Sequence, residues 1–329
     1  MLGVRDLQIF FYTDRGVARA VDGASFSVNR GEVVGLVGES GCGKSVAAMS
    51  ILGIVAHPGK IAGGKVMLDD QDLIGLSPRD MQYVRGGRIG IVFQDPMTAL
   101  NPAIRIGEQV AEVLRAHEGK AGMLRDMALL MRTGKGNAAW KRAIASLDEV
   151  GIPAPSRRAF DFPHEFSGGL RQRIVMAAAV SGDPEFLIAD EPTTALDVTV
   201  QAQILELMAK LKDMHNMGIL LITHDLGVVA QICDRAAVMY AGHVVEEGAV
   251  DQVLHESLHP YTKALLECVP SSSLSDIMPE GIPGAPPDPL DMPEGCRFQP
   301  RCSQSRDGCE LPQEMRVVGG RRVRCLLYD

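Results

Sequence analysis

Eight consecutive residues near the start of the chain have the types and spacing of a phosphate-binding loop. They match G-x-x-x-x-G-K-[ST] at every fixed position and read Gly38, Glu39, Ser40, Gly41, Cys42, Gly43, Lys44 and Ser45. Glycines let backbone N–H groups cradle phosphate oxygens, the lysine reaches the β- and γ-phosphates, and the serine hydroxyl can ligate Mg²⁺. We therefore expect ATP to be bound by Gly38, Ser40, Gly41, Cys42, Gly43, Lys44, Ser45 and Val46.

Two adjacent acids follow a short apolar strand much later in the chain. Residues 186–189 are apolar, and Asp190 and Glu191 come directly after them. Acids at the end of a buried strand are costly unless they serve a cation or a reaction. Taken alone, a solvated strand end explains them equally well. Beside a phosphate-binding loop, Asp190 suits Mg²⁺ binding and Glu191 suits the general base that polarises water.

The elements that must position these residues alternate between strands and helices. Short apolar strands are expected at 32–37, 89–93, 186–189 and 219–223, with helices at 45–55 and 200–212, while residues 1–30 have the alternation of strands and turns. Between about 96 and 182 the apolar spacing becomes helical, which predicts an inserted helical subdomain. The fold class is therefore an α/β P-loop NTPase. Residues 116–140 carry no assignable chemistry.

Composition narrows the class of protein. The 329 residues carry a formal net charge of -8, which argues against a nucleic-acid partner. No apolar run approaches the ~20 residues needed to cross a bilayer, and the N-terminus lacks the apolar core of a secretory signal. We expect a cytoplasmic protein whose contact with a membrane depends on a partner.

Four cysteines crowd the end of the chain, after a proline-rich, linker-like segment that begins near residue 269. Their spacing is C-x5-C-x6-C-x15-C, formed by Cys296, Cys302, Cys309 and Cys325. In a reducing compartment such a cluster suggests metal rather than disulfides. Four thiolates suit either a [4Fe–4S] cluster or Zn²⁺, and the spacing does not choose between them. Unligated thiols in a loose tail are the third possibility.

A glycine-rich segment about 20 residues before the acidic pair points to one family. Residues 166–173 read FSGGLRQR, open a helix and resemble the signature motif of ABC ATPases. The other landmarks follow in family order: Gln94 resembles the Q-loop glutamine, Asp197 the D-loop aspartate and His224 the switch histidine. Alone, each could be a strand-end or capping residue. Their joint order over about residues 3–270 carries the resemblance, which also makes Phe11, and then Tyr12, the adenine-stacking aromatic.

The resemblance implies an active site divided between two subunits. In the family, the signature segment contacts the ATP held by a partner's P-loop, which assigns that role to Ser167, Gly168, Gly169 and Gln172. The implied catalytic residues are Glu191, His224 and Gln94, and the implied Mg²⁺ contacts are Ser45, Gln94 and Asp190. An isolated subunit is then expected to be a poor ATPase.

One subfamily is the most similar. The run HPYTKALL at 259–266, the proline-rich segment and the cysteine tail resemble the ATP-binding subunits of oligopeptide/dipeptide importers. That implies an ATPase domain over 1–268 and a C-terminal extension over 269–329. It also implies a second ABC ATPase subunit in a heterodimer, two membrane permeases and an extracytoplasmic binding protein, with this chain peripheral on the cytoplasmic face of the inner membrane. An iron–sulfur cluster is favoured over zinc.

Other functions remain as alternatives. Nickel or other small-solute importers are close relatives of the peptide importers. A non-transport ABC ATPase would carry long coiled coils, and no heptad run of that length occurs here. A catalytically silent regulatory subunit is disfavoured by the presence of Glu191 and His224. A different P-loop enzyme, such as a small-molecule kinase, has no use for the Ser167 segment.

Overall fold

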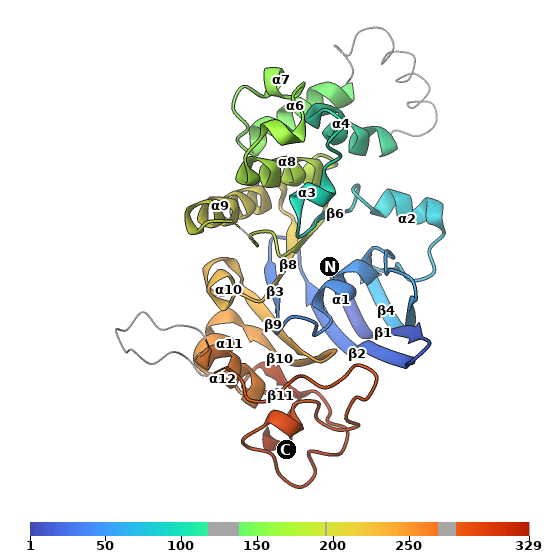
Figure 1. Cartoon of the computed structure of the whole chain (residues 1–329), viewed down its shortest axis with the longest axis vertical. Helices are drawn as coiled ribbons and strands as arrows, with labels where there is room; N and C mark the ends of the chain where they lie inside the picture. The colour runs from blue at the N-terminus through green and yellow to red at the C-terminus, as the bar shows by residue number, and fades with distance from the viewer. Residues whose placement is uncertain (118–137, 195, 269–280, 329) are drawn as a thin grey trace. The chain divides into compact units, whose positions relative to one another are not determined.

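The computed structural model describes most of the chain as two compact units (Figure 1). The described residues are 1–117, 138–194, 196–268 and 281–328. The first unit combines Met1–Gly75 with Leu220–Asp329, and the second is Leu76–Ile219. Most of the segment 116–140, Ala195 of the expected D-loop, and residues 269–280 of the proline-rich segment lie outside the described residues.

The N-terminal residues of the first unit form a four-stranded sheet in the order β2-β1-β4-β5. Its strands are β1 (Leu2–Thr13), β2 (Gly16–Val28), β4 (Gly59–Leu68) and β5 (Gln71–Asp72). The pairings of β1 with β2 and with β4 are antiparallel. In β1, Leu2, Val4, Leu7 and Ile9 are buried. The expected strands over residues 1–30 are confirmed.

A second sheet of this unit carries the phosphate-binding loop. The strands of this sheet that are described with the first unit follow the order β11-β12-β10-β9-β3-β8. They are β3 (Val33–Val37), β8 (Gly218–Thr223), β9 (Arg235–Tyr240), β10 (His243–Ala249), β11 (Arg316–Val318) and β12 (Arg321–Val323). Every residue of β3 is buried, and β3 pairs in parallel with β9. The helices of this unit are α1 (Lys44–Ile51), α10 (Leu226–Ile232), α11 (Val250–His255) and α12 (Pro260–Glu267), with the 3₁₀ turns η2 (Gln299–Arg301) and η3 (Leu326–Tyr328).

The second unit consists mainly of helices beside two parallel strands. The strands are β6 (Ile89–Val92) and β7 (Phe186–Asp190), with Ile89 opposite Phe186. Its helices are α2 (Pro78–Val84), α3 (Pro96–Ala99), α4 (Ile106–His117), α6 (Ala138–Glu149), α7 (Pro155–Arg158), η1 (Pro163–Glu165), α8 (Gly168–Val180) and α9 (Val198–His215). Since α4, α6 and α8 pack on one another, the expected helical character of residues 96–182 is confirmed for the described part.

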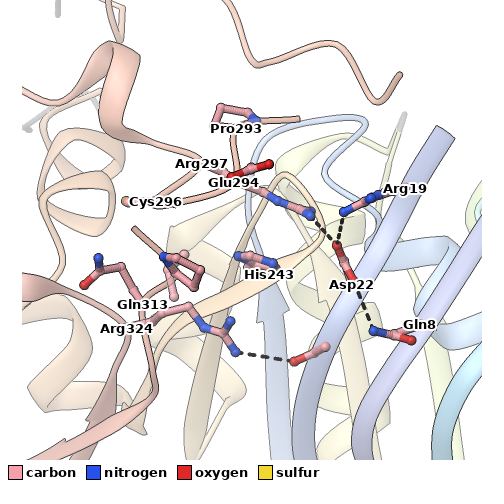
Figure 2. A pocket seen from close by; sticks show the side chains of 14 residues that line it. Gln8, Arg19, Asp22, His243, Pro293, Glu294, Cys296, Arg297, Gln313 and Arg324 are labelled. Atoms are coloured by element: carbon pink, nitrogen blue, oxygen red, sulfur yellow. Dashed lines mark hydrogen bonds and ion pairs between the residues drawn. The ribbon is translucent and has the colours of Figure 1, made fainter. Parts of the chain in front are cut away.

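The cysteine tail is attached to the first unit through both backbone and side chains. Strand β12 pairs with β10, so the tail extends the sheet that carries the phosphate-binding loop. Arg297 of the tail donates to the Asp22 carboxylate at 2.6 Å, and Figure 2 shows Asp22 also facing Arg19 and Gln8. These residues line a pocket with an empty volume of about 730 Å³. The expected irregular tail is therefore built onto the sheet.

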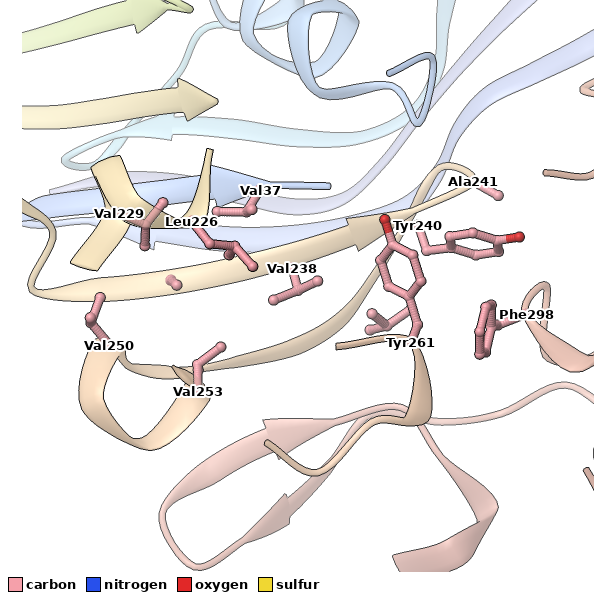
Figure 3. Packing of buried hydrophobic residues seen from close by; sticks show 12 residues of the cluster. Val37, Leu226, Val229, Val238, Tyr240, Ala241, Val250, Val253, Tyr261 and Phe298 are labelled. Atoms are coloured by element: carbon pink, nitrogen blue, oxygen red, sulfur yellow. The ribbon is translucent and has the colours of Figure 1, made fainter. Parts of the chain in front are cut away.

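An aromatic cluster joins the tail to helix α12. The rings of Tyr240 and Tyr261 lie 4.5 Å apart between centroids, and Phe298 of the tail lies 5.2 Å from Tyr240 and 5.3 Å from Tyr261. Figure 3 shows these rings beside Val238, with Val37 of β3 in the same buried cluster. Such ring pairs add about 1 kcal/mol each beyond the burial of their area.

Among the described residues, the helices are all too short or too polar to span a lipid bilayer.

Candidate functional site

The loop between β3 and α1 passes so close to neighbouring backbone that two of its positions require glycine. A Cβ on Gly38 would lie 2.0 Å from the Met239 carbonyl oxygen, and one on Gly43 would lie 2.4 Å from the Ala20 carbonyl oxygen. Both glycines have positive φ, 155° and 102°. A neighbouring carbonyl cannot rotate aside as a side chain can, so only glycine fits at these two positions. No side chain therefore covers the loop backbone there.

Lys44 places a positive charge inside this loop. Its side chain is buried, and Nζ donates to the carbonyl oxygens of Gly38 at 2.7 Å and Glu39 at 2.9 Å. The Cys42 sulfur lies 3.7 Å from the same ammonium. Burial raises the pKa of the Cys42 thiol, although Lys44 acts in the opposite direction. The Cys42 thiol is therefore neutral and does not offset the positive charge of Lys44. A loop with this positive charge suits the binding of a polyanion.

The first turn of α1 completes the phosphate-binding half of the site. It contains Lys44, Ser45 and Val46, while Ser40 and Gly41 are exposed on the loop before it. Within the described residues, neither an acidic residue nor a capping side chain occupies this turn. The positive end of the helix dipole therefore lies where phosphate is expected.

Glu39 is held from two directions, by Tyr261 and by Arg301, and the sequence singled out only the first of them. Its backbone N–H donates to the Tyr261 hydroxyl at 2.9 Å, and its carboxylate accepts from Arg301 at 2.9 and 3.2 Å. Tyr261 belongs to the HPYTKALL run, so the importer-like motif contacts the phosphate-binding loop directly. Arg301 lies 262 positions from Glu39, and no local pattern predicts this pair.

The two candidate adenine-binding aromatics are neighbours at the end of β1. Phe11 is half-buried against Gly59, whereas Tyr12 is 46% exposed and has the Lys60 ammonium 5.7 Å from its ring centroid. Adjacent strand residues point to opposite faces of a sheet, so only one of them can face a given base. The preference for Phe11 stays a prediction.

The second unit brings together two of the residues assigned to hydrolysis, Gln94 and Glu191, whereas His224 belongs to the first unit. Asp190 ends β7 and is 3% exposed, and Glu191 follows it with a φ of 46°. One carboxylate oxygen of Glu191, Oε2, accepts from Gln94 Nε2 at 3.0 Å and from Thr194 Oγ1 at 2.9 Å. Because β6 and β7 are parallel neighbours, Gln94 and Glu191 leave the sheet at the same edge. The sequence did not predict the hydrogen bond from Thr194 to Glu191.

The signature segment begins a helix with an unusual cap. Ser167 is the N-cap residue of α8 and is exposed, but its side chain makes no capping hydrogen bond within the described residues. Gly168 is also exposed, and a Cβ on Gly169 would lie 2.6 Å from Val200 Cγ1. Gln172 differs from expectation because it is 1% exposed, so its side chain does not join the exposed part of the segment.

The two remaining landmarks lie next to helix starts. Asp197 caps α9 by accepting a hydrogen bond from the Val200 N–H at 2.9 Å. His224 directly follows β8 and is exposed, and Asp225 after it caps α10. The roles of Asp197 and His224 at the nucleotide stay predictions.

All four tail cysteines line one small pocket, together with His259 and other residues. Burial raises the pKa of Cys296 to about 11, and the other three cysteines act in the same direction. Within the described residues, no group of three or more His, Cys, Asp or Glu side chains is placed to hold a metal ion. The thiols thus surround a common space without being arranged as the ligands of one ion.

Comparison with models of protein families shows which family this chain belongs to. A family model described as "ABC transporter" matches residues 21–194, more than half of the chain. The chain belongs to the ABC transporter family. Its C-terminal part also matches a model described as "Oligopeptide/dipeptide transporter, C-terminal region", over residues 245–309. The resemblance seen in the landmarks is confirmed.

Individual relatives of this ABC protein cover nearly its whole length. The oligopeptide transport ATP-binding protein OppD of Bacillus subtilis is 48% identical over 92% of this chain and 81% of its own. AppD of the same organism, also an oligopeptide transport ATP-binding protein, is 44% identical over 100% of this chain and 97% of its own. Among solved structures, the dimeric ATP-binding cassette MJ0796, in a post-hydrolysis state with ADP and Pi, matches with a TM-score of 0.60 and 26% identity over 76% of this chain and 99% of that one.

Proposed function

We propose that this ABC protein is the ATP-hydrolysing subunit that powers import of oligopeptides or dipeptides. The observation that carries the proposal is the Glu191 carboxylate, fixed by Gln94 and Thr194 directly after a buried Asp190. A carboxylate fixed at the end of a buried strand in a P-loop protein suits a general base for water attack. The names of the relatives supply the substrate class.

In this proposal the P-loop binds the triphosphate through its backbone, Lys44 and the first turn of α1. Mg²⁺ takes oxygen ligands, and Ser45, Gln94 and Asp190 supply oxygens of the kind it prefers. His224 faces the γ-phosphate as the switch residue, and Phe11, or else Tyr12, stacks on the adenine. Phosphoryl transfer depends mainly on positioning and charge stabilisation, so these fixed groups contribute most of the catalysis.

The second half of each site comes from another subunit. Ser167, Gly168 and Gly169 lie exposed at the N-terminus of the 13-residue helix α8, where backbone N–H groups suit the γ-phosphate of a partner's ATP. The buried Gln172 serves packing rather than nucleotide contact. The dimeric form of the related cassette MJ0796 supports pairing of this kind.

The complete importer contains further chains. We propose a heterodimer of this protein with a second ABC ATPase subunit, beneath two membrane permeases and supplied by an extracytoplasmic binding protein. The ATPase is then a peripheral protein of the cytoplasmic face of the inner membrane. The match of residues 245–309 to the oligopeptide/dipeptide C-terminal region favours peptides over the alternative of nickel.

The cysteine tail is proposed to hold a [4Fe–4S] cluster through Cys296, Cys302, Cys309 and Cys325, with Zn²⁺ as the alternative. The proposal is supported by the four thiols that line one pocket, because thiolates, which metal binding generates from thiols, are preferred ligands of both iron–sulfur clusters and Zn²⁺. When bound, the cluster supplies cross-links between tail segments and hence folding free energy.

Transport is tested by reconstituting the complete complex in vesicles and following uptake of a labelled tripeptide. We expect ATP-dependent uptake that is lost in Lys44→Ala. Uptake of Ni²⁺ but not of peptides would overturn the peptide assignment and leave the ATPase assignment intact.

The tail is tested by metal analysis of chain purified without oxygen. We expect iron and acid-labile sulfide, with both lost in Cys302→Ala. Stoichiometric zinc without iron would refute the cluster.

A further inference from the structure

A single arginine connects the cysteine tail to the phosphate-binding loop. The side chain of Arg301 is 4% exposed, and its Nη1 and Nη2 donate to Oε2 and Oε1 of Glu39 at 2.9 and 3.2 Å. This bidentate geometry is the strong form of an arginine–carboxylate pair. The next residue in the chain is Cys302, one of the four cysteines around the common pocket.

The remaining donors of Arg301 are also occupied, so its position is fixed. Nη1 donates to the Tyr240 hydroxyl at 3.2 Å, Nη2 to the Ile282 carbonyl at 3.1 Å, and Nε to the Pro283 carbonyl at 2.9 Å. The guanidinium carbon lies 5.8 Å from the Tyr240 ring centroid. These contacts tie the tail and the end of β9 to the same side chain.

The contact with Arg301 affects a residue that determines the conformation of the phosphate-binding loop, Glu39. Its carbonyl accepts from Lys44 Nζ, and its N–H is held by Tyr261, so the residue sets the shape of the loop around the ammonium. Its carboxylate is negative and lies on the loop that binds a triphosphate. Without a cation beside it, this carboxylate would repel the phosphates. The start of the loop would also lose the contact that holds its position.

Arginines beside two of the other three cysteines also contact the ATPase core. Arg297, next to Cys296, donates to the Ala241 carbonyl and to Asp22. Arg324, next to Cys325, has Nη2 3.5 Å from the Gly23 carbonyl. Figure 2 shows both arginines in the pocket between the tail and β2, where Asp22 and a backbone carbonyl already engage them. Three arginines that neighbour tail cysteines therefore bond to the ATPase core.

We propose that Arg301 is a positioning residue for the ATP site, through which the cysteine tail controls the affinity of the P-loop for nucleotide. This proposal rests on the proposed function only in taking the P-loop as the ATP site. Arg301 neutralises Glu39 and fixes its turn, so that Lys44 and the loop backbone are ready for the triphosphate. A disordered tail withdraws Arg301 and leaves the Glu39 charge uncompensated.

The test measures the dissociation constant of mant-ATP with Mg²⁺ for the full-length chain and its variants. Arg301→Met should weaken binding by about tenfold or more, because the half-buried Glu39 carboxylate loses its charged partner beside the triphosphate. Arg301→Lys should lie between Arg301→Met and the wild type. The double variant Glu39→Gln with Arg301→Met should recover to within about threefold of the wild type, because replacing both partners leaves no unpaired charge.

The matched control is Arg306→Met. Arg306 also belongs to the tail, but its guanidinium donates to the Leu326 carbonyl within the tail rather than to the ATPase core. Its variant should keep the wild-type affinity. Thermal unfolding without nucleotide reports whether each variant is folded, and the double variant remains informative even if Arg301→Met alone is unstable.

A link to the cysteines is tested by Cys302→Ala. It should weaken mant-ATP binding in the wild-type background but have little further effect in the Glu39→Gln, Arg301→Met background, as expected for coupled positions. Wild-type affinity in Arg301→Met, or equal losses in Arg301→Met and Arg306→Met without recovery in the double variant, would overturn the proposal. If the wild-type chain bound no mant-ATP, the proposed function itself would fail.

Discussion

At the scale of single residues, the proposed chemistry depends on the orientation of the Glu191 carboxylate. Its Oε2 accepts hydrogen bonds from Gln94 and Thr194, which hold the side chain in one position. The left-handed backbone at Glu191 is uncommon for a residue with a side chain and is typical of functional sites. The local structure thus fixes the carboxylate before any substrate binds.

Replacing this carboxylate with an amide should separate binding from turnover. Glu191→Gln keeps the shape of the side chain but removes its basicity, so the assembled complex should bind ATP and hydrolyse it at least ~100-fold more slowly. Phosphate release and mant-ATP binding are measured on the same preparation. Glu206→Gln, on the exposed face of α9, is the control and should hydrolyse ATP normally. Normal turnover in Glu191→Gln would remove Glu191 from the mechanism.

Residue types alone predicted the site where its chemistry is local. The P-loop, Asp190 with Glu191, and the Ser167 segment are each contiguous, so their spacing carries the information. Gln172 was assigned by the resemblance to the signature motif, and its burial within α8 could not be predicted from that motif. The pair of Arg301 and Glu39 could not be predicted, since it depends on how the tail folds back on the P-loop.

At the scale of elements, two helices of the second unit begin with serine and differ in what the serine does. Ser77 caps α2 by accepting a hydrogen bond from the Asp80 N–H at 3.2 Å. Ser167 begins α8 without any such bond in the described part of the chain. A serine that does not stabilise its own helix is available to serve another molecule.

This difference predicts that replacing each serine with alanine affects a different property of the protein. Ser77→Ala should cost about 1 kcal/mol of unfolding free energy with ATPase activity unchanged. Ser167→Ala should change stability by less than about 0.5 kcal/mol yet lower the ATPase activity of the assembled complex. Thermal unfolding and phosphate release distinguish the two. A stability loss in Ser167→Ala as large as that in Ser77→Ala would show that its hydroxyl is only a cap.

The attachment of the tail depends on Phe298, which is 2% exposed between Tyr240, Tyr261 and His259. Phe298→Ala should cost about 3 to 5 kcal/mol, because a large ring is removed from a packed cluster. Limited proteolysis should then cut the tail first. Leu311→Ala is the matched control in the tail, since Leu311 is 60% exposed and its loss should have little effect. Equal resistance of both variants would show that the aromatic cluster does not hold the tail.

At the scale of the whole molecule, the class of fold followed from the order of strands and helices, but the place of the tail did not. The three-residue strands β11 and β12 are too short to show alternation, and β12 becomes a strand because β10 offers it an edge. The proline-rich composition therefore suggested a loose extension. In the structure, the tail instead adds strands to the edge of a sheet. In the proposed function, a partner chain supplies the remaining part of the active site, just as Ser167 of this chain serves the partner's ATP.

Photolabelling of the assembled complex with a γ-phosphate-linked photoreactive ATP tests that division of the site directly. Lys44→Ala in this chain disables its own P-loop, so nucleotide remains only at the partner's P-loop. We expect this chain to be labelled within residues 166–173 even so, and the label to disappear when the partner's P-loop lysine is changed instead. Label that is lost with Lys44→Ala, or that never reaches the Ser167 segment, would show that the two subunits do not share their nucleotides.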